Sequence, residues 1–82
     1  MRRTIGILGL GIFGRSIART LAEFDYDVIA VDKSEENIND LEPLITKGVV
    51  GDISDRDLLE TIGIGDCDAV VISTGTVLEA SV

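Results

Sequence analysis

Histidine and tryptophan are absent from this 82-residue chain, and cysteine and proline occur once each. Without histidine, general acid–base catalysis would depend on carboxylates, and no carboxylate in the sequence has a partner suited to that work. Cys67 cannot form an internal disulfide and has no histidine to activate it, so we expect an inert thiol in a reducing compartment. These absences favour binding over catalysis, and we expect that the chain is not an enzyme.

Aromatic residues and long apolar runs are also scarce. Aromatic residues make up 4% of the sequence, so aliphatic side chains must form the core, as is typical of a buried parallel sheet. The longest run without a charged residue covers residues 4–14, which is too short to span a bilayer. We therefore expect a soluble, cytoplasmic domain.

Positive charge is the third scarcity. Seven basic residues stand against 15 acidic ones, which gives a formal net charge of −8. Such a surface repels the phosphates of nucleic acids and anionic lipids, so neither is expected as a direct partner. Salt screens the repulsion beyond about 8–10 Å, which leaves room for a local phosphate site.

Apolar stretches and turn signals alternate along the chain in the manner of an α/β fold. Strands are expected at residues 4–8, 28–31, around 49–50 and at 69–72. Helices are expected at 12–24, from a Ser34 cap to about residue 42, and from a Ser54 cap to Gly63. Another helix is expected over 77–82.

This order predicts a Rossmann-like, doubly wound parallel sheet with strand order 3-2-1-4 (β-α-β-α-β-α-β), treated as one domain over residues 1–82. It corresponds to the N-terminal half of a full nucleotide-binding sheet. The fourth strand would then be an apolar edge, which predicts self-association. The inward-facing helix residues are expected to be Phe13, Ile17, Leu21, Phe24, Ile38, Leu41, Leu58, Leu59 and Ile62.

A glycine motif lies where the first strand meets the first helix. Gly9, Gly11 and Gly14 form G-x-G-x-x-G. Gly9 would permit the tight turn, Gly11 would let a phosphate approach the backbone, and Gly14 would let the helix pack closely on the sheet. The N-terminus of the helix favours an anion, so the motif predicts a pyrophosphate site.

Asp32 closes the second strand, 18 residues after Gly14. A carboxylate at this place can accept hydrogen bonds from both ribose hydroxyls, and it would repel a 2′-phosphate, which disfavours NADP. The alternative is a tight turn without a ligand, followed by an aspartate that caps a helix.

Several neighbours of these residues are further candidates for nucleotide binding. Asp52 could reach the adenine edge, or it could be a solvated turn residue. Arg15 could touch phosphate, but a solvent-facing or intersubunit ion pair is favoured. We expect no metal site, because Asp55, Asp57 and Glu60 fit a capped, solvated helix face. The remaining candidates are Ile12, Phe13, Lys33, Ile53, Thr74 and Gly75.

The segments "GLGIFG", "VIAVDKSEE", "GD" after the third strand and "DAVVIST" together resemble the KTN (RCK-type) domain. This is the nucleotide-binding regulatory module of Trk and Ktr potassium uptake systems and of related potassium channels. The resemblance implies an adenine nucleotide (ATP, ADP or NAD(H)) held by the three glycines and Asp32, with Asp52 near the base and Thr74 near phosphate or ribose. It also implies a dimer or ring that gates a potassium-translocating membrane subunit.

Two features depart from that family. Many members carry an arginine where this chain has Ile12, so discrimination between ATP and ADP does not follow from the resemblance. The family domain also continues for several more strands and helices. Two alternatives therefore stay open: the NAD-binding half of a dehydrogenase, and a self-associating half-domain without regulatory function.

Overall fold

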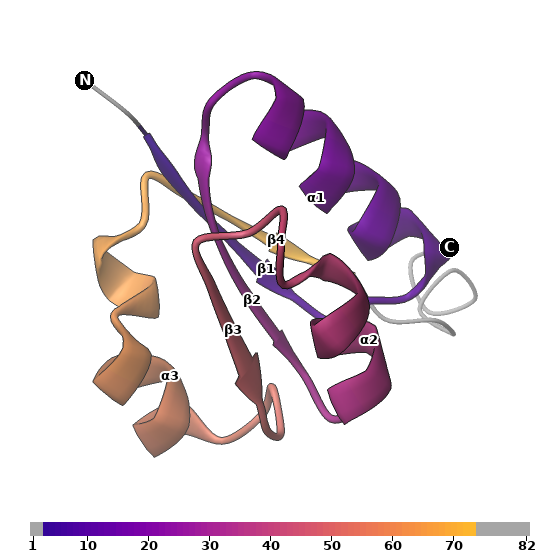
Figure 1. The fold of residues 1–82 in the computed structure, drawn as a ribbon. Helices are drawn as coiled ribbons and strands as arrows, with labels where there is room; N and C mark the ends of the chain where they lie inside the picture. Colours follow the sequence, from indigo (N-terminus) through magenta and orange to yellow (C-terminus); the bar gives the residue numbers. More distant parts are fainter. Residues whose placement is uncertain (1–2, 74–82) are drawn as a thin grey trace, which may run out of the picture.

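A computed structural model describes residues 3–73 of the chain. The helix expected over 77–82 and the candidate residues Thr74 and Gly75 lie outside the described residues. The elements follow the predicted alternation of strands and helices (Figure 1). They are β1 (Thr4–Leu8), α1 (Ile12–Glu23), β2 (Asp27–Asp32), α2 (Glu35–Leu41), β3 (Lys47–Val50), α3 (Arg56–Ile62), the 3₁₀ helix η1 (Ile64–Asp66) and β4 (Ala69–Ile72).

The four strands form one parallel sheet in the order β3-β2-β1-β4, as the sequence predicts. Leu8 pairs with Val31 on one side and with Ile72 on the other. Val50 pairs with Asp32 at the end of β3. The carboxyl ends of all four strands therefore meet at one edge of the sheet, where ligands bind in folds of this kind.

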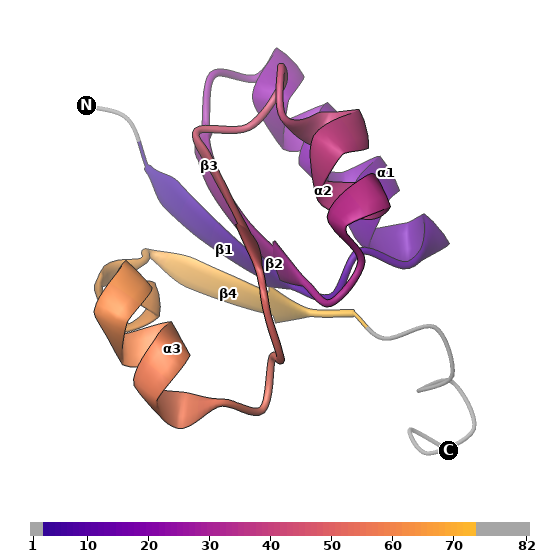
Figure 2. The ribbon, with the colours of Figure 1, turned by 60° about the horizontal axis from the view of Figure 1, so that its bottom comes forward.

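Helices cover both faces of the sheet. Figure 2 shows α1 and α2 together on one face and α3 on the other. The side chains of β1 alternate between the faces, because successive residues of a strand point in opposite directions. Ile5 and Ile7 belong to the cluster under α1 and α2, whereas Leu8 belongs to the cluster under α3 and η1.

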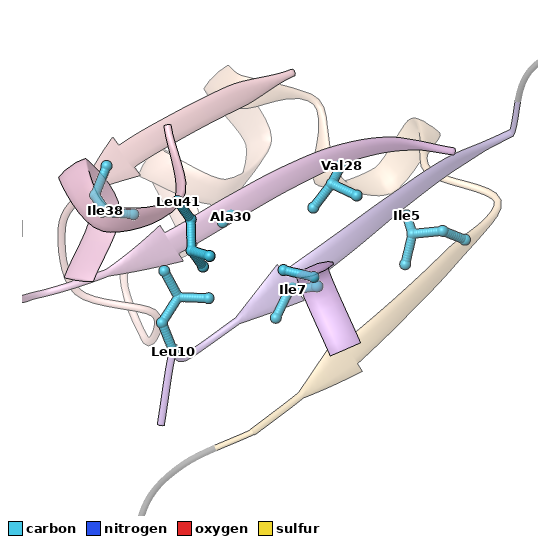
Figure 3. Packing of buried hydrophobic residues seen from close by; sticks show 8 residues of the cluster. Ile5, Ile7, Leu10, Val28, Ala30, Ile38 and Leu41 are labelled. Atoms are coloured by element: carbon cyan, nitrogen blue, oxygen red, sulfur yellow. The ribbon is translucent and has the colours of Figure 1, made fainter. Parts of the chain in front are cut away.

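The larger core lies on the α1–α2 face (Figure 3). Leu10 is part of it and is 1% exposed, although it stands in the glycine motif outside any helix or strand. Its buried side chain anchors the loop between β1 and α1 to the core. The other buried members are Ile5, Ile7, Ala18, Val28, Ala30, Ile38 and Leu41.

The smaller core lies on the opposite face and has three buried members, Leu8, Val31 and Ile64. Leu58, Leu59 and Ile62 of α3 pack against it but remain half-buried, so their predicted inward orientation is confirmed in part. This face also leaves apolar surface uncovered along β4, where Val70 is 41% and Ile72 is 66% exposed.

The prediction for the inner face of α1 is wrong at its two aromatic residues. Phe13 is 66% and Phe24 is 70% exposed. Ile17 and Leu21 pack against the core as predicted, but Gly14 and Ala18 are the residues of α1 that are buried. The small residues face the sheet because α1 lies too close to it for a phenylalanine side chain to fit between the helix and the sheet.

The caps of the two short helices differ in how well the sequence predicted them. Ser34 caps α2 as predicted, with its side chain accepting a hydrogen bond from Asn37 N at 3.3 Å. Asp55, rather than Ser54, caps α3 and accepts from Leu58 N at 3.2 Å. The hydroxyl of Ser54 is not free for this role, because it donates to Asp52 at 2.7 Å.

Two glycines of the motif have the predicted structural roles. Gly9 has a φ of 96°, a conformation that side chains other than glycine rarely adopt. A Cβ on Gly14 would collide with the carbonyl oxygen of Gly9 and would also press on the Ser73 side chain. The absence of a side chain at Gly14 therefore sets how closely α1 approaches the loop and the sheet.

We expect Gly14→Ala to lower the free energy of unfolding by about 1–3 kcal/mol, because the added methyl group overpacks against backbone. Alanine otherwise stabilises a helix interior by about 1 kcal/mol over glycine, so the sign of the change is informative. Gly65→Ala is the matched control, because a Cβ at Gly65 meets nothing within 4 Å. Urea unfolding measures both, and a more stable Gly14→Ala protein would contradict the packing argument.

Candidate functional site

A cavity of about 250 Å³ opens at the carboxyl edge of the sheet. It is lined by residues that follow β1, end or follow β2, and follow β3. All of the lining residues that the structure describes are among the candidate binding residues predicted from the sequence. They are Gly9, Asp32, Lys33, Asp52 and Ile53.

The N-terminus of α1 stands beside this cavity without a side-chain cap. Gly9 fixes the turn by donating its N–H to Val31 O at 2.8 Å. Gly11 is the N-cap residue, with extended backbone (φ −68°, ψ −173°), and it offers no side chain to the helix. The first hydrogen bond within the helix runs from Arg15 N to Gly11 O. The N–H groups before Arg15 therefore have no partner within the helix, and the helix dipole adds about half a positive charge there.

The carboxylate of Asp32 accepts three hydrogen bonds from residues that the structure describes. Leu10 N donates to Oδ1 at 2.8 Å, Ser34 N donates to Oδ2 at 2.8 Å, and Asn37 Nδ2 donates to Oδ2 at 3.3 Å. An ionised carboxylate offers about four acceptor positions. Asp32 therefore stabilises the fold in its own right, and its carboxylate has room for about one further hydrogen-bond donor.

Asn37 is the residue at this site that the sequence reasoning missed. Its amide also donates to the carbonyl oxygen of Leu10 at 3.3 Å, so it joins α2 to both Asp32 and the glycine loop. Asn37 stands three residues after the capping Ser34, where a polar side chain often reaches back over the start of a helix. That spacing is the signal that could have identified it.

Lys33 and Asp52 face each other across the rim of the cavity. Their side chains form an exposed ion pair with 3.9 Å between Nζ and Oδ2. The hydroxyl and the backbone N–H of Ser54 both donate to Asp52 Oδ1, at 2.7 and 2.8 Å. The side-chain bond from Ser54, then the backbone bond, and to a lesser extent the charge of Lys33 hold the pKa of Asp52 below its ordinary value. Asp52 is thus a fixed acceptor at the rim.

Other predicted residues are not part of the cavity wall. Ile12 is 84% exposed, and it stands with Phe13 on the first turn of α1. Ser73, the last described residue before the candidates Thr74 and Gly75, is buried directly after β4, and its N–H donates to Leu8 O. Arg15 forms an ion pair with Asp40 of α2 at 3.8 Å, so its favoured solvent-facing pair lies within the chain.

The thiol of Cys67 is half-buried against Gly63 O, with 3.8 Å between the sulfur and the oxygen. Burial, followed by the charges of Asp66 and Asp68, raises the pKa of this thiol. A raised pKa suppresses the reactive thiolate, which agrees with the inert thiol expected from the sequence.

Residues 3–73 lack two further kinds of feature. They contain no group of three or more His, Cys, Asp or Glu side chains placed to hold a metal ion. None of the helices in this range is long and apolar enough to cross a membrane.

A known protein family matches most of this chain. The family described as the TrkA-N domain matches residues 5–82. The chain belongs to the TrkA-N family. The resemblance inferred from the sequence is therefore confirmed.

Among curated proteins, this TrkA-N chain is similar to two potassium uptake proteins of Bacillus subtilis (strain 168). It is 32% identical to Ktr system potassium uptake protein C over 82 residues, which is the whole of this chain and 37% of that protein. It is 30% identical to Ktr system potassium uptake protein A over 96% of this chain and 36% of that protein. The TrkA-N chain thus spans little more than a third of these relatives.

Among solved structures, the TrkA-N chain is similar to N5-carboxyaminoimidazole synthetase from Staphylococcus aureus complexed with ADP. The TM-score is 0.72 at 24% sequence identity, over 89% of this chain and 19% of the enzyme. At this identity the likeness concerns the fold alone.

We expect Ser54→Ala to raise the pKa of Asp52, because the variant removes the hydrogen bond that contributes most to the depressed value. The rise should be incomplete, since the backbone N–H of residue 54 still donates. Carboxyl ¹³C chemical shifts followed through a pH titration measure it. Ser16→Ala, at an exposed position on α1, serves as the control. An Asp52 pKa equal in both variants would refute the assignment.

Proposed function

We propose that this TrkA-N chain is an adenine-nucleotide-binding regulatory domain of a potassium uptake system. The observation that carries the proposal is the cavity at the carboxyl edge of the sheet, where Gly9, Asp32, Lys33, Asp52 and Ile53 come together beside the uncapped start of α1. The names of the similar Bacillus proteins supply the link to potassium uptake.

The proposed ligand divides between the cavity and the start of α1. A volume of about 250 Å³ is smaller than most pockets for a whole ligand, and it suits the adenosine portion alone. The phosphates would lie outside it, on the N–H groups of residues 11–14, which have no partner within the helix and where the helix dipole favours negative charge.

Asp32 is proposed to hold the ribose, and Asp52 is proposed to accept a hydrogen bond from the adenine amino group. Because Asp32 already accepts three hydrogen bonds, we propose that it takes one ribose hydroxyl, fewer than the two expected from the sequence. Its charge would repel the 2′-phosphate of NADP. ADP, ATP and NAD(H) share the parts that these groups would contact, so each is a candidate ligand.

We propose that the domain acts by binding a nucleotide, and that its partner carries out the transport. Among the described residues, the titratable groups that line the cavity are two carboxylates held by other groups and Lys33, whose ammonium group pairs with Asp52. The partner we propose is a potassium-translocating membrane subunit, with this domain on its cytoplasmic side. Nucleotide occupancy would then change the geometry of an assembled regulatory protein.

Calorimetric titration with ATP, ADP, AMP, NAD⁺, NADH and NADP⁺ tests the proposal. We expect a nucleotide with a diphosphate to bind and NADP⁺ to bind at least about tenfold more weakly than NAD⁺ or not at all. Asp32→Asn should weaken binding by about tenfold or more, since it removes a charge-assisted hydrogen bond.

Glu60→Gln is the matched control for Asp32→Asn, because it removes one negative charge from the exposed face of α3. Its affinity should equal that of the unchanged chain. A chain that binds none of the six nucleotides would refute the proposed function, and equal affinities of the two variants would refute the role of Asp32.

We also expect the 82-residue chain to self-associate in solution. Val70 and Ile72 leave apolar surface exposed on β4, at the edge of the described sheet, and such edges pair with a second copy. Sedimentation equilibrium at micromolar concentration should detect a dimer, which Ile72→Glu should weaken. Lys47→Glu, at an exposed position on the opposite edge strand, is the control. A stable monomer at these concentrations would contradict the expectation.

A further inference from the structure

We propose that Asn37 is a positioning residue of the nucleotide site, which holds Asp32 and the glycine loop in one fixed arrangement. The inference rests on the proposed function, because it concerns how that site is prepared for a ribose and a diphosphate. It assigns a role to a residue that does not line the cavity.

The geometry around the Asn37 amide carries the inference. Its Nδ2 lies 3.3 Å from Asp32 Oδ2 and 3.3 Å from Leu10 O. Both neighbours are acceptors without a hydrogen to give, so the amide nitrogen and its two hydrogens must face them. One side chain of α2 therefore connects the carboxylate proposed for the ribose to the loop proposed for the phosphates.

The position of Asn37 is itself fixed from both sides. Its backbone N–H donates to the hydroxyl of the capping Ser34 at 3.3 Å. The following residue, Ile38, is 2% exposed in the larger core. The amide thus projects from a helix turn that cap and core hold in place, which is what a supporting side chain needs.

The groups that hold the Asp32 carboxylate in place lie outside the cavity wall. Asp32 lines the cavity, whereas its donors Leu10, Ser34 and Asn37 are not among the residues that line it. Two of these donors are backbone N–H groups, which any residue other than proline would supply. Asn37 is the one donor that depends on the identity of a side chain, so the sequence controls the orientation of Asp32 through this residue.

The decisive variant is Asn37→Asp, which keeps the shape and replaces the donating amide by a second carboxylate. Two oxygens of like charge would then meet where a hydrogen bond was, and the Leu10 carbonyl would lose its donor. Asn39→Asp introduces the same charge on the same helix at an exposed position, which makes it the matched control.

Calorimetry with ADP and with 2′,3′-dideoxy-ADP, which lacks both ribose hydroxyls, provides the readout. We expect Asn37→Asp to bind ADP at least about tenfold more weakly than Asn39→Asp does. We also expect the preference for ADP over the dideoxy compound to shrink by about threefold or more, because a displaced Asp32 no longer recognises the hydroxyl. A loss of stability alone would weaken both ligands equally.

Asn37→Ala keeps the test decisive if the aspartate variant fails to fold. It removes the amide without adding charge and should reduce the same preference. Equal ADP affinities for the position 37 and 39 variants, or an unchanged preference for the hydroxyls, would overturn the role of Asn37 and leave the proposed function standing. If the unchanged chain binds no nucleotide in the calorimetric panel, both proposals fail.

Discussion

The carboxylate of Asp32 joins segments that are far apart along the chain. It ends β2, accepts the N–H of Leu10 from the loop after β1, and accepts the N–H of Ser34 at the start of α2. The buried side chain of Leu10 ties the same loop to the larger core. The part of the cavity wall formed by Asp32 and the loop after β1 is therefore set by the folded chain before any ligand arrives, and a site prepared in this way loses less conformational freedom on binding.

An acidic chain that is proposed to bind phosphates needs a local source of positive potential. The net charge is −8, but the negative charge at the cavity is engaged: Asp32 by donors from the loop and α2, and Asp52 by Ser54 and Lys33. The start of α1, which has no side-chain cap, contributes positive potential beside the cavity. Charges farther away are screened beyond about 8–10 Å, so the geometry of this edge outweighs the overall charge.

The sequence predicted the sheet order, and the described residues that line the cavity are all among its candidate binding residues, because glycine spacing and strand ends are local signals. The predictions from the sequence were wrong where tertiary packing decides which side chains are buried or which residue caps a helix. Phe13 and Phe24 follow helical spacing, yet the close approach of α1 to the sheet leaves them exposed. Ser54 is a good cap by composition, but Asp52 takes its hydroxyl and Asp55 caps the helix instead. Asn37 was missed because its importance depends on partners 5 and 27 residues away along the chain.

The two faces of the described sheet are unequal, since the hydrophobic cluster under α1 and α2 has eight buried members and the cluster under α3 and η1 has three. Amide protons in α3 should therefore exchange with solvent through local opening, well before those of β1 and β2, which require global unfolding. Ile53 packs against the weaker face, so one wall of the cavity belongs to the part that opens first. Such breathing would give a ligand a way in and out while the opposite wall, with its supporting helices, stays intact.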